Sequence, residues 1–366
     1  MKSNSHTRIN IVKSMFNEKP LILIKNESFE ITTFVYESGV AGLKIDNGHC
    51  NMVVLPYMGH QIWFAEFEGK KLNQKSIFDY PRDTTKFGDN YGAFLIHCGL
   101  TNINGPDEGE SYPMHGELPF AKYHDNYIEI GNDSKGNYIS CGGVFDYRNS
   151  QDYYYEYIPE LKIYENESIA NMNVQINNKR KSDLNYLYMC HMNWLAVDGS
   201  ILEYSAVKNN VKIQDLPKVG SSKRENELLE FVEKIESNPF ALDKIDLNNQ
   251  NFNPELCINI KYEKDDNNWS HATQVFPDGN SAYVGFNSSN LPYGLRWYCQ
   301  TGDENGLGFA LPTTGTNRSS KYQYENGNFN TIKGNESDFI QFKFGYLNKE
   351  ETQEMSKHIK KIIEGK

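Results

Sequence analysis

Apolar and polar positions follow a period of two, or gather in short β-branched and aromatic runs, over most of the chain between residues 21 and 347. Runs of this kind are typical of β-strands. Asn-Gly and Asp-Gly pairs, which favour tight hairpin turns, lie between several of them. The pattern therefore predicts a large, mostly antiparallel all-β protein. The expected strand regions are 21–39, 51–59, 127–132, 153–178, 185–195, 255–263, 281–289, 295–302 and 339–347.

Two stretches carry a helical pattern instead. Residues 221–237 start with serines and carry an apolar stripe, and residues 348–365 start with acids and end with lysines before a glycine. We expect both helices to be peripheral. The sequence shows neither an internal repeat nor a low-complexity linker. It therefore predicts one β domain over residues 1–366, with an N-terminal extension at 1–20 and a C-terminal helix at 349–366.

The charge balance narrows the range of partners. The formal net charge is -11, and no basic stretch is interleaved with aromatic residues, so we do not expect nucleic acid as a partner. No run of about 18 apolar residues occurs, and the first residues lack an apolar segment followed by small residues. We therefore expect no membrane partner and a cytoplasmic location. The sequence leaves the oligomeric state open.

Cysteine and histidine spacings do not suggest a metal or a cofactor. The six cysteines lie far apart without a Cys-x-x-Cys pair, which is typical of buried, reduced thiols. The nine histidines show no spacing typical of metal ligands, and nucleotide-binding glycine motifs and the Gly-x-Ser-x-Gly motif do not occur. We therefore expect no metal and no cofactor.

The stretch "HCGLTNINGPDEGESYPMHGELP" begins as a buried strand and continues as a polar loop that ends at His115. Gly116 allows close backbone approach there, and Glu117 follows. Loops on a rigid β scaffold often carry binding groups. His115 is therefore either a turn-capping histidine or a ligand-binding one. His97, inside the apolar run, is expected in the core.

A second histidine lies within the strand "YLYMCHMNWL". His191 and Asn193 project to one face because alternate residues of a strand point the same way, whereas Cys190, Met192 and Trp194 point to the other. A polar pair inside an apolar strand either satisfies a buried partner or faces a ligand cavity. Two polar residues on one face favour the cavity.

Four further residues are candidates on chemical grounds. Glu255 opens a strand directly after Pro254, where it is either a general base, if partly desolvated, or an edge charge that protects the sheet. Arg296, Trp297 and Arg318 lie near the C-terminal strands. Tryptophan and arginine suit sugar faces and hydroxyls, and both are also common packing and surface residues.

Taken in order, four motifs resemble the galactose mutarotase-like superfamily, and in particular its bacterial branch of aldose 1-epimerase-like proteins. The resemblance covers residues 45–347 approximately, and the second motif is the most specific. The motifs are "MVVLPYMGHQIWFAEFEGKKL", "CGLTNINGPDEGESYPMHGELPFA", "HMNW" and "YENGNFNTIKGNESDFIQFKFGYL".

The resemblance implies a β-supersandwich that holds a hexose in a groove across one sheet. In active mutarotases a glutamate takes a proton from the anomeric hydroxyl and a histidine gives one to the ring oxygen. Carried over by position, His191 is the general acid and His115 orients substrate hydroxyls. Asn102, Asn193 and Trp297 then line the groove. The resemblance thus implies an isomerase that interconverts the anomers of a small-molecule carbohydrate.

The chain departs from the family at the catalytic glutamate. The family has a Gly-apolar-Glu setting at the end of a C-terminal strand, and here "GLGFALPTTG" has Leu311 or Pro312 at that place. Glu255 matches an acid that this branch often carries before a mid-chain strand, so it is the replacement candidate. Glu117 is another, and Glu304 would need a shifted register to enter the groove.

This departure leaves two alternatives open. One is a non-catalytic sugar-binding or sensor protein that kept the groove and lost the base. The other is a different sugar isomerase on the same scaffold. The sequence does not specify the sugar, and Arg82, Arg296 or Arg318 could bind an anionic substituent.

Overall fold

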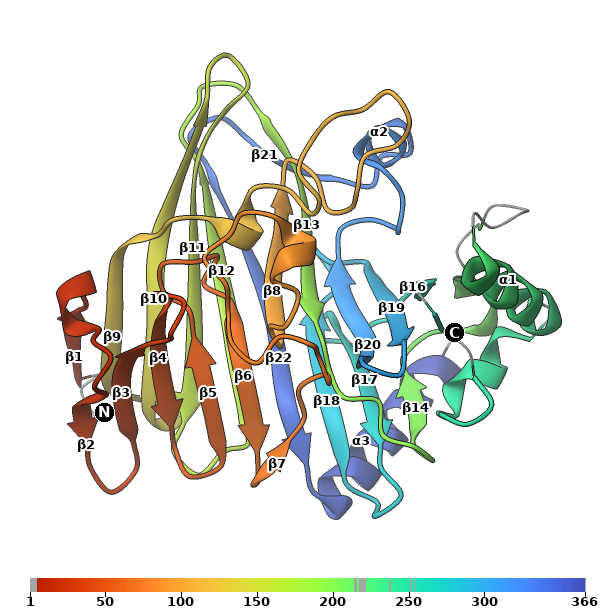
Figure 1. The fold of residues 1–366 in the computed structure, drawn as a ribbon, viewed down its shortest axis with the longest axis horizontal. Helices are drawn as coiled ribbons and strands as arrows, with labels where there is room; N and C mark the ends of the chain where they lie inside the picture. The colour runs from red at the N-terminus through yellow and green to blue at the C-terminus, as the bar shows by residue number, and fades with distance from the viewer. Residues whose placement is uncertain are drawn as a thin grey trace.

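Two large antiparallel sheets pack face to face, and the hydrophobic core lies between them (Figure 1). The computed structural model describes residues 5–213, 216, 222–236, 238–250, 252–253 and 255–365. Phe94, which packs against Trp194 on one side of the core, meets Phe344 of the other sheet, with the ring centres of Phe94 and Phe344 5.8 Å apart. The all-β architecture predicted from the period-two pattern is confirmed.

In the part of the chain that the structure describes, one sheet has nine strands. In spatial order they are β1 (Ser5–Asn10), β9 (His124–Asp133), β10 (Gly136–Asn149), β11 (Tyr153–Tyr164), β12 (Ile169–Asn178), β22 (Ser337–Leu347), β18 (Ser281–Asn287), β17 (Trp269–Val275) and β14 (Ile201–Tyr204). Strand β1 lies within the segment expected as an N-terminal extension, and it pairs with β9 at the edge of the sheet.

Within the described residues, the other sheet has thirteen strands. In spatial order eleven of them are β15 (Val211–Ile213), β16 (Leu256–Lys261), β19 (Tyr293–Gln300), β20 (Asn305–Thr313), β13 (Leu184–Met192), β8 (Leu95–Leu100), β6 (Ile62–Phe67), β5 (Cys50–Val54), β4 (Ala41–Asp46), β3 (Glu30–Val35) and β2 (Leu21–Lys25). Two short strands lie beside this path: β21 (Asn330–Ile332) pairs with β13, and β7 (Lys70–Lys71) pairs with β6.

The two sheets differ in how their outer faces are covered. Along β11 and β12 every second residue is buried and the others are partly exposed, as expected for strands with one face toward solvent. Strands β8, β13 and β20 are buried on both faces almost throughout. Loops over their outer face explain this: Asn104 Nδ2, for example, donates to the backbone oxygens of Thr316 and Arg318.

The helices lie at the periphery. They are α1 (Lys223–Ile235), α2 (Ser320–Glu325) and α3 (Lys349–Glu364), with short 3-10 turns at Lys13–Met15, Phe87–Asp89, Leu118–Phe120, Lys208–Asn210 and Pro239–Asp243. The two helices predicted from sequence correspond to α1 and α3, and a capping box of Asn348 and Glu351 begins α3. Among the described residues, no helix is long and apolar enough to cross a membrane.

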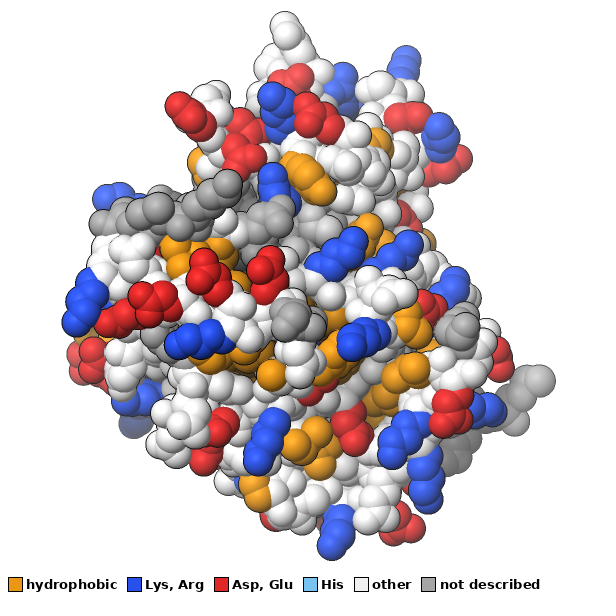
Figure 2. All heavy atoms as spheres, turned by 90° about the vertical axis from the view of Figure 1, so that its right-hand side faces the viewer, with side chains coloured by type: hydrophobic (Ala, Val, Ile, Leu, Met, Phe, Trp, Pro, Cys, Tyr) orange, Lys and Arg blue, Asp and Glu red, His pale blue; other side chains and the backbone are white. Residues whose placement is uncertain are grey.

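Helix α3 covers the outer face of the nine-stranded sheet at one end, where Ser281 Oγ and Thr352 Oγ1 are 2.9 Å apart. Helix α1 lies at the far end of the long axis from β1 and β2 (Figure 1). Figure 2, which looks onto the α1 side, shows lysine and arginine side chains interspersed with acidic ones and with exposed hydrophobic groups. Charges of both signs therefore share this face.

Candidate functional site

His191 and His115 meet on the outer face of the thirteen-stranded sheet. Their ring centres are 5.6 Å apart, and the ring planes are inclined by 77°. His191 belongs to β13, where strand alternation directs its side chain away from Trp194 in the core. His115 is at the end of the loop that follows β8. The structure thus brings together the two histidines singled out in the sequence.

Tyr91 joins this pair and was not found from the sequence. Its hydroxyl lies 3.1 Å from His191 Nε2 and 3.2 Å from Asn193 Oδ1. Asn193 Nδ2 donates to the Ala93 carbonyl at 2.9 Å, so its Oδ1 faces Tyr91 and can only accept. Tyr91 therefore donates to Asn193 and accepts from the Nε2 proton of His191. One tyrosine among 24, outside any motif, gives no sequence signal.

Trp297 of β19 and Glu255, the residue before β16, complete the cluster. The Trp297 ring centre is 5.4 Å from that of His191 and 5.6 Å from that of Tyr91. Its indole Nε1 donates to Glu255 Oε2 at 2.7 Å. Glu255 is exposed, whereas Trp297 is buried. The carboxylate is thus held at the mouth of the cluster by the indole.

The loop that carries His115 is fixed by its own polar groups. His115 has a φ of 61°, and its Nδ1 bonds to the Ile103 carbonyl. A carbonyl only accepts, so Nδ1 carries the proton of the neutral ring and Nε2 stays an acceptor. Asn102 Nδ2 donates to the backbone oxygens of Asn104 and Pro113, at 3.1 and 2.9 Å. Asn102 therefore shapes the loop.

Burial keeps both histidines neutral. It lowers the pKa of His191 to about 3, with the nearby His115 as the second cause, and it lowers the pKa of His115 to about 4. Burial also raises the pKa of Tyr91, and the charge of Glu255 adds to that shift. The cluster therefore contains neutral donors and acceptors, with one carboxylate at its mouth.

Glu117 anchors the loop at its far end. Its Oε1 accepts from the backbone N–H groups of Leu100 and Thr101, at 2.8 and 3.2 Å, and from the Tyr155 hydroxyl. Its Oε2 accepts from Thr101 Oγ1 at 2.5 Å. Burial raises the pKa of this carboxyl. Both carboxylate oxygens are thus engaged with β8 and β11.

Two of the arginines singled out in the sequence lie over tyrosine rings. Arg296 is fully buried on the core side of β19, where Nη1 bonds to Asp243 Oδ1 at 2.7 Å and the guanidinium lies over Tyr204. Arg318 lies over the ring of Tyr322, at 4.7 Å from its centre. Arg296 is therefore on the opposite face of the sheet from the histidine pair.

The position at which the sequence resemblance implies a catalytic acid is apolar. Thr313 is paired with Met189, and Leu311, two residues before Thr313, is paired with Leu295. Strand alternation therefore puts Leu311 on the same face as His191, and it is 1% exposed. Glu304 lies in the turn before β20, where its backbone N–H donates to Thr301 Oγ1 at 3.1 Å.

A cavity of about 470 Å³ lies farther along the same sheet face. Asn259 of β16, one of its lining residues, is paired with Leu295 of β19, which is paired with Leu311. The cavity is therefore three strands from β13. Its lining is polar and carries three cationic side chains, those of Lys212, Lys261 and Arg318.

Known proteins resemble this chain in structure rather than in sequence. No model of a protein family matches it, and no curated protein does. A candidate aldose 1-epimerase from Klebsiella pneumoniae superposes with a TM-score of 0.80 at 13% identity, over 99% of this chain and 96% of the other. A galactose mutarotase-like protein from Clostridium acetobutylicum gives a TM-score of 0.60 at 12% identity, over 88% and 100%.

A third solved structure agrees with these two. A candidate mutarotase from Salmonella typhimurium gives a TM-score of 0.55 at 8% identity, over 90% of this chain and 97% of the other. Identities this low carry information about the fold alone. The chain therefore has the galactose mutarotase-like sandwich fold, as the resemblance of its sequence motifs implies.

Proposed function

We propose that this protein interconverts the anomers of an aldose or a sugar derivative by acid and base catalysis, as an aldose 1-epimerase does. The observation that carries the proposal is the convergence of His191, His115 and Tyr91 beside an indole that holds the Glu255 carboxylate. An acid and a base around one small site are what ring opening requires. The fold neighbours from Klebsiella pneumoniae and Salmonella typhimurium support a sugar as the substrate.

In the proposed step, Glu255 takes the proton of the anomeric hydroxyl, and protonated His191 gives its proton to the ring oxygen. The bond between C1 and the ring oxygen breaks, which leaves the open-chain aldehyde. After rotation about the C1–C2 bond the two transfers run in reverse, so both residues regain their starting protonation. His115, through Nε2, accepts a hydrogen bond from a sugar hydroxyl. Tyr91 orients the His191 ring.

The lowered pKa of His191 limits the expected rate. Efficient proton transfer needs a pKa near the working pH, and burial lowers that of His191 to about 3. A sugar that brings the Glu255 carboxylate toward the ring would raise it. We expect an acceleration near the lower end of the usual range for acid and base catalysis, about 10²-fold.

The adjoining cavity bears on the choice of substrate. Lys212, Lys261 and Arg318 make its lining cationic, and it shares the sheet face of His191. Cationic side chains bind phosphate and carboxylate groups. We propose that a sugar with an anionic substituent fits this face better than a neutral one.

Two-dimensional NMR exchange spectroscopy tests the activity directly. Anomer exchange is measured for neutral, phosphorylated and acidic aldoses with the wild-type protein, His191→Ala and His124→Ala. His124 is an exposed histidine on the other sheet and serves as a matched control. We expect acceleration for at least one sugar, retained in His124→Ala and lost in His191→Ala. Full activity in His191→Ala would contradict the assignment.

A non-catalytic sugar-binding function is the second candidate, because Leu311 occupies the place of the expected acid. Titration calorimetry with the same sugars separates the two functions. Binding without anomer exchange would favour the sugar-binding function, whereas binding with exchange would favour catalysis.

A further inference from the structure

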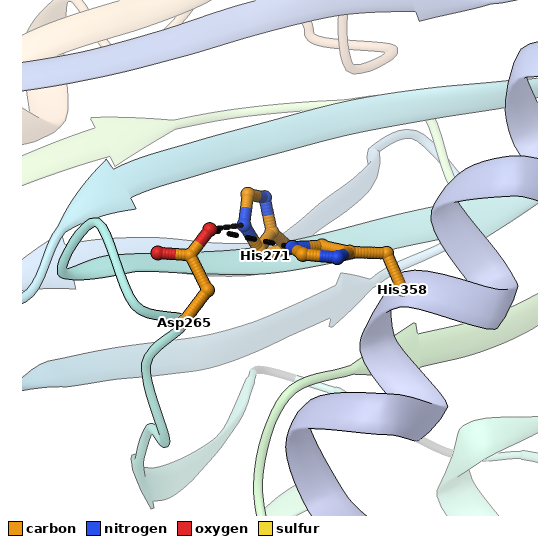
Figure 3. A group of neighbouring side chains, drawn as sticks. All are labelled: Asp265, His271 and His358. Carbon is orange, nitrogen blue, oxygen red and sulfur yellow. Dashed lines mark hydrogen bonds and ion pairs between the residues drawn. The ribbon is translucent and has the colours of Figure 1, made fainter.

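A second histidine cluster lies on the nine-stranded sheet, far from the first in sequence. It consists of Asp265 in the turn before β17, His271 of β17 and His358 of α3 (Figure 3). Asp265 Oδ2 is 3.3 Å from His271 Nε2 and 3.3 Å from His358 Nε2. The three ligand atoms all lie within 4.8 Å of one another. One carboxylate oxygen thus faces two imidazole nitrogens.

These separations match a tetrahedral metal site. With zinc bonds of about 2.0 to 2.1 Å to nitrogen and oxygen, adjacent ligand atoms of a tetrahedron are about 3.3 to 3.4 Å apart. Both oxygen-to-nitrogen separations have that value. The two imidazole nitrogens lie within 4.8 Å of one another, and the His358 side chain, 41% exposed on a helix surface, can turn toward His271. A small adjustment therefore completes the geometry.

The ligands are oriented by partners behind them. Asp265 Oδ1 accepts from the backbone N–H groups of Asn267 and Trp269, at 2.8 and 2.9 Å, which leaves Oδ2 for the histidines. His271 Nδ1 lies 3.0 Å from the Tyr283 hydroxyl. When that hydroxyl accepts from Nδ1–H, the lone pair of Nε2 is available to a metal. Hydrogen bonds of this kind orient metal ligands in known sites.

A glycine makes the contact with Tyr283 possible. Gly285 is paired directly with His271 across β17 and β18. A Cβ atom at Gly285 would lie 2.2 Å from the Tyr283 hydroxyl oxygen and 3.5 Å from His271 Nδ1. Only glycine leaves room for this hydroxyl beside the imidazole. The position is thus fitted to hold the His271 ring.

The site is open to solvent, and the charge of Lys343 opposes a cation there. The side chains of Asp265 and His271 are 13% and 8% exposed, so the better exposed His358 forms the entrance. Lys343 is paired with Gly285 on the side away from His271, and its Nζ lies over the Trp269 ring at 4.5 Å. Its charge weakens cation binding, while the Asp265 carboxylate favours it.

We infer that Asp265, His271 and His358 form a binding site for a divalent transition-metal ion of the zinc class. Two imidazoles and one carboxylate are a donor set that zinc uses in proteins, with water as the fourth ligand. The bound ion would fasten α3 to the outer face of the nine-stranded sheet. This site is independent of the sugar chemistry proposed above.

Competitive titration with a chromophoric chelator tests the site on full-length protein freed of metal by a chelating resin. ZnCl₂ is added to the wild type, to His358→Ala, and to His124→Ala, which removes an exposed histidine bonded to the carboxylate of Asp125. We expect one tight site in the wild type and in His124→Ala, and a loss of affinity of about 100-fold or more in His358→Ala. The visible spectrum of the Co²⁺-loaded protein should show tetrahedral coordination.

Two graded variants separate a metal site from a hydrogen-bonded cluster. Tyr283→Phe should weaken zinc binding about 10-fold, because it removes the partner of His271. Lys343→Met should strengthen it, because it removes the opposing charge. Zinc should raise the midpoint of thermal unfolding of the wild type and not that of His358→Ala. Equal zinc affinity in the wild type and His358→Ala, or no tight site in the wild type, would overturn the inference.

Discussion

The two histidine clusters use carboxylates in opposite ways. On the thirteen-stranded sheet, His191 bonds to the hydroxyl of Tyr91, and the Glu255 carboxylate accepts a hydrogen bond from the indole of Trp297. On the nine-stranded sheet, a carboxylate oxygen lies 3.3 Å from each of two imidazole nitrogens. A direct carboxylate contact concentrates negative charge between ring nitrogens, which favours a cation. An indirect one leaves neutral imidazoles facing a ligand.

The two clusters also differ in how the sheet face around each of them is covered. The histidines of the first cluster lie where loops bury both faces of β8 and β13, so a sugar could be held away from bulk water. The second cluster lies between β17 and α3, where His358 projects from the helix and its side chain is 41% exposed. The first environment suits proton transfer in a desolvated site, and the second suits exchange of an ion with solvent.

The largest effect is expected from a change at Glu255, the carboxylate of the first cluster. Glu255→Gln should lower kcat for anomer exchange about 100-fold, because the amide cannot take the proton of the anomeric hydroxyl. Adding Leu311→Glu should restore at least about 10-fold, because strand alternation puts that side chain on the face of His191. NMR exchange spectroscopy measures both.

Glu304→Gln serves as the control for this pair of variants, since Glu304 lies in a turn and contacts Thr301. It should leave kcat unchanged. Thermal unfolding must show that the double variant is folded, because a buried acid is destabilising. A folded Glu255→Gln with wild-type exchange would remove Glu255 from the mechanism.

The parts of this comparison that could be predicted from sequence are the local ones. Strand alternation is fixed by neighbours in the chain, so the shared face of His191 and Asn193 followed from their spacing. Strand alternation also predicts the face to which Arg296 points, which its chemical type alone does not. Arg296 and Trp297 are adjacent in one strand and must point to opposite faces, and the structure has Arg296 in the core.

The rest depends on pairings between distant segments. Asp265 and His358 are 93 residues apart, and helix docking alone brings them together. Tyr91 reaches His191 across 100 residues. The role of Glu117 depended on backbone N–H groups at the end of β8, which no residue pattern displays. Long-range contacts of this kind have no local signature in one sequence.

The next largest effect is expected from a change at Tyr91, whose hydroxyl is the hydrogen-bond partner of His191. Tyr91→Phe removes the hydroxyl that orients the imidazole and keeps the ring beside Trp297. We expect kcat to fall about 5-fold with little change in KM, since an orienting hydrogen bond to a neutral group contributes about 1 kcal/mol. Tyr57→Phe, whose hydroxyl bonds to the Ile11 carbonyl, is the control. A change in KM alone would indicate a binding role.

Low pH should destabilise the protein because burial hinders protonation of His97 and His191 in the folded state. Burial lowers the pKa of His97 and His191 to about 3, while an unfolded histidine titrates near 6.5. Below pH 6.5 the unfolded state binds protons that the folded state does not, so stability falls as pH falls toward about 3. Each residue should cost about 2 kcal/mol at pH 5.

Urea unfolding at pH 7.5, 6 and 5 in the presence of a chelator measures this slope. His97→Gln should flatten it, because it removes one histidine whose Nδ1 meets the hydroxyls of Tyr157 and Tyr188. Equal stability at pH 7.5 and pH 5 would show that these histidines take up protons in the folded state.

The smallest effect is expected from a change at Trp297, which lies beside His191 and donates to the Glu255 carboxylate. Trp297→Phe keeps an aromatic ring beside His191 and removes the indole donor to Glu255. The freed carboxylate samples more rotamers, so the productive geometry is less populated, and we expect kcat/KM to fall about 3-fold. Because the base is still present in Trp297→Phe, the loss should be much smaller than in Glu255→Gln. Equal losses of activity in Trp297→Phe and Glu255→Gln would show that the indole itself contacts the substrate. The indirect contact of the Glu255 carboxylate would then not distinguish the first cluster from the second.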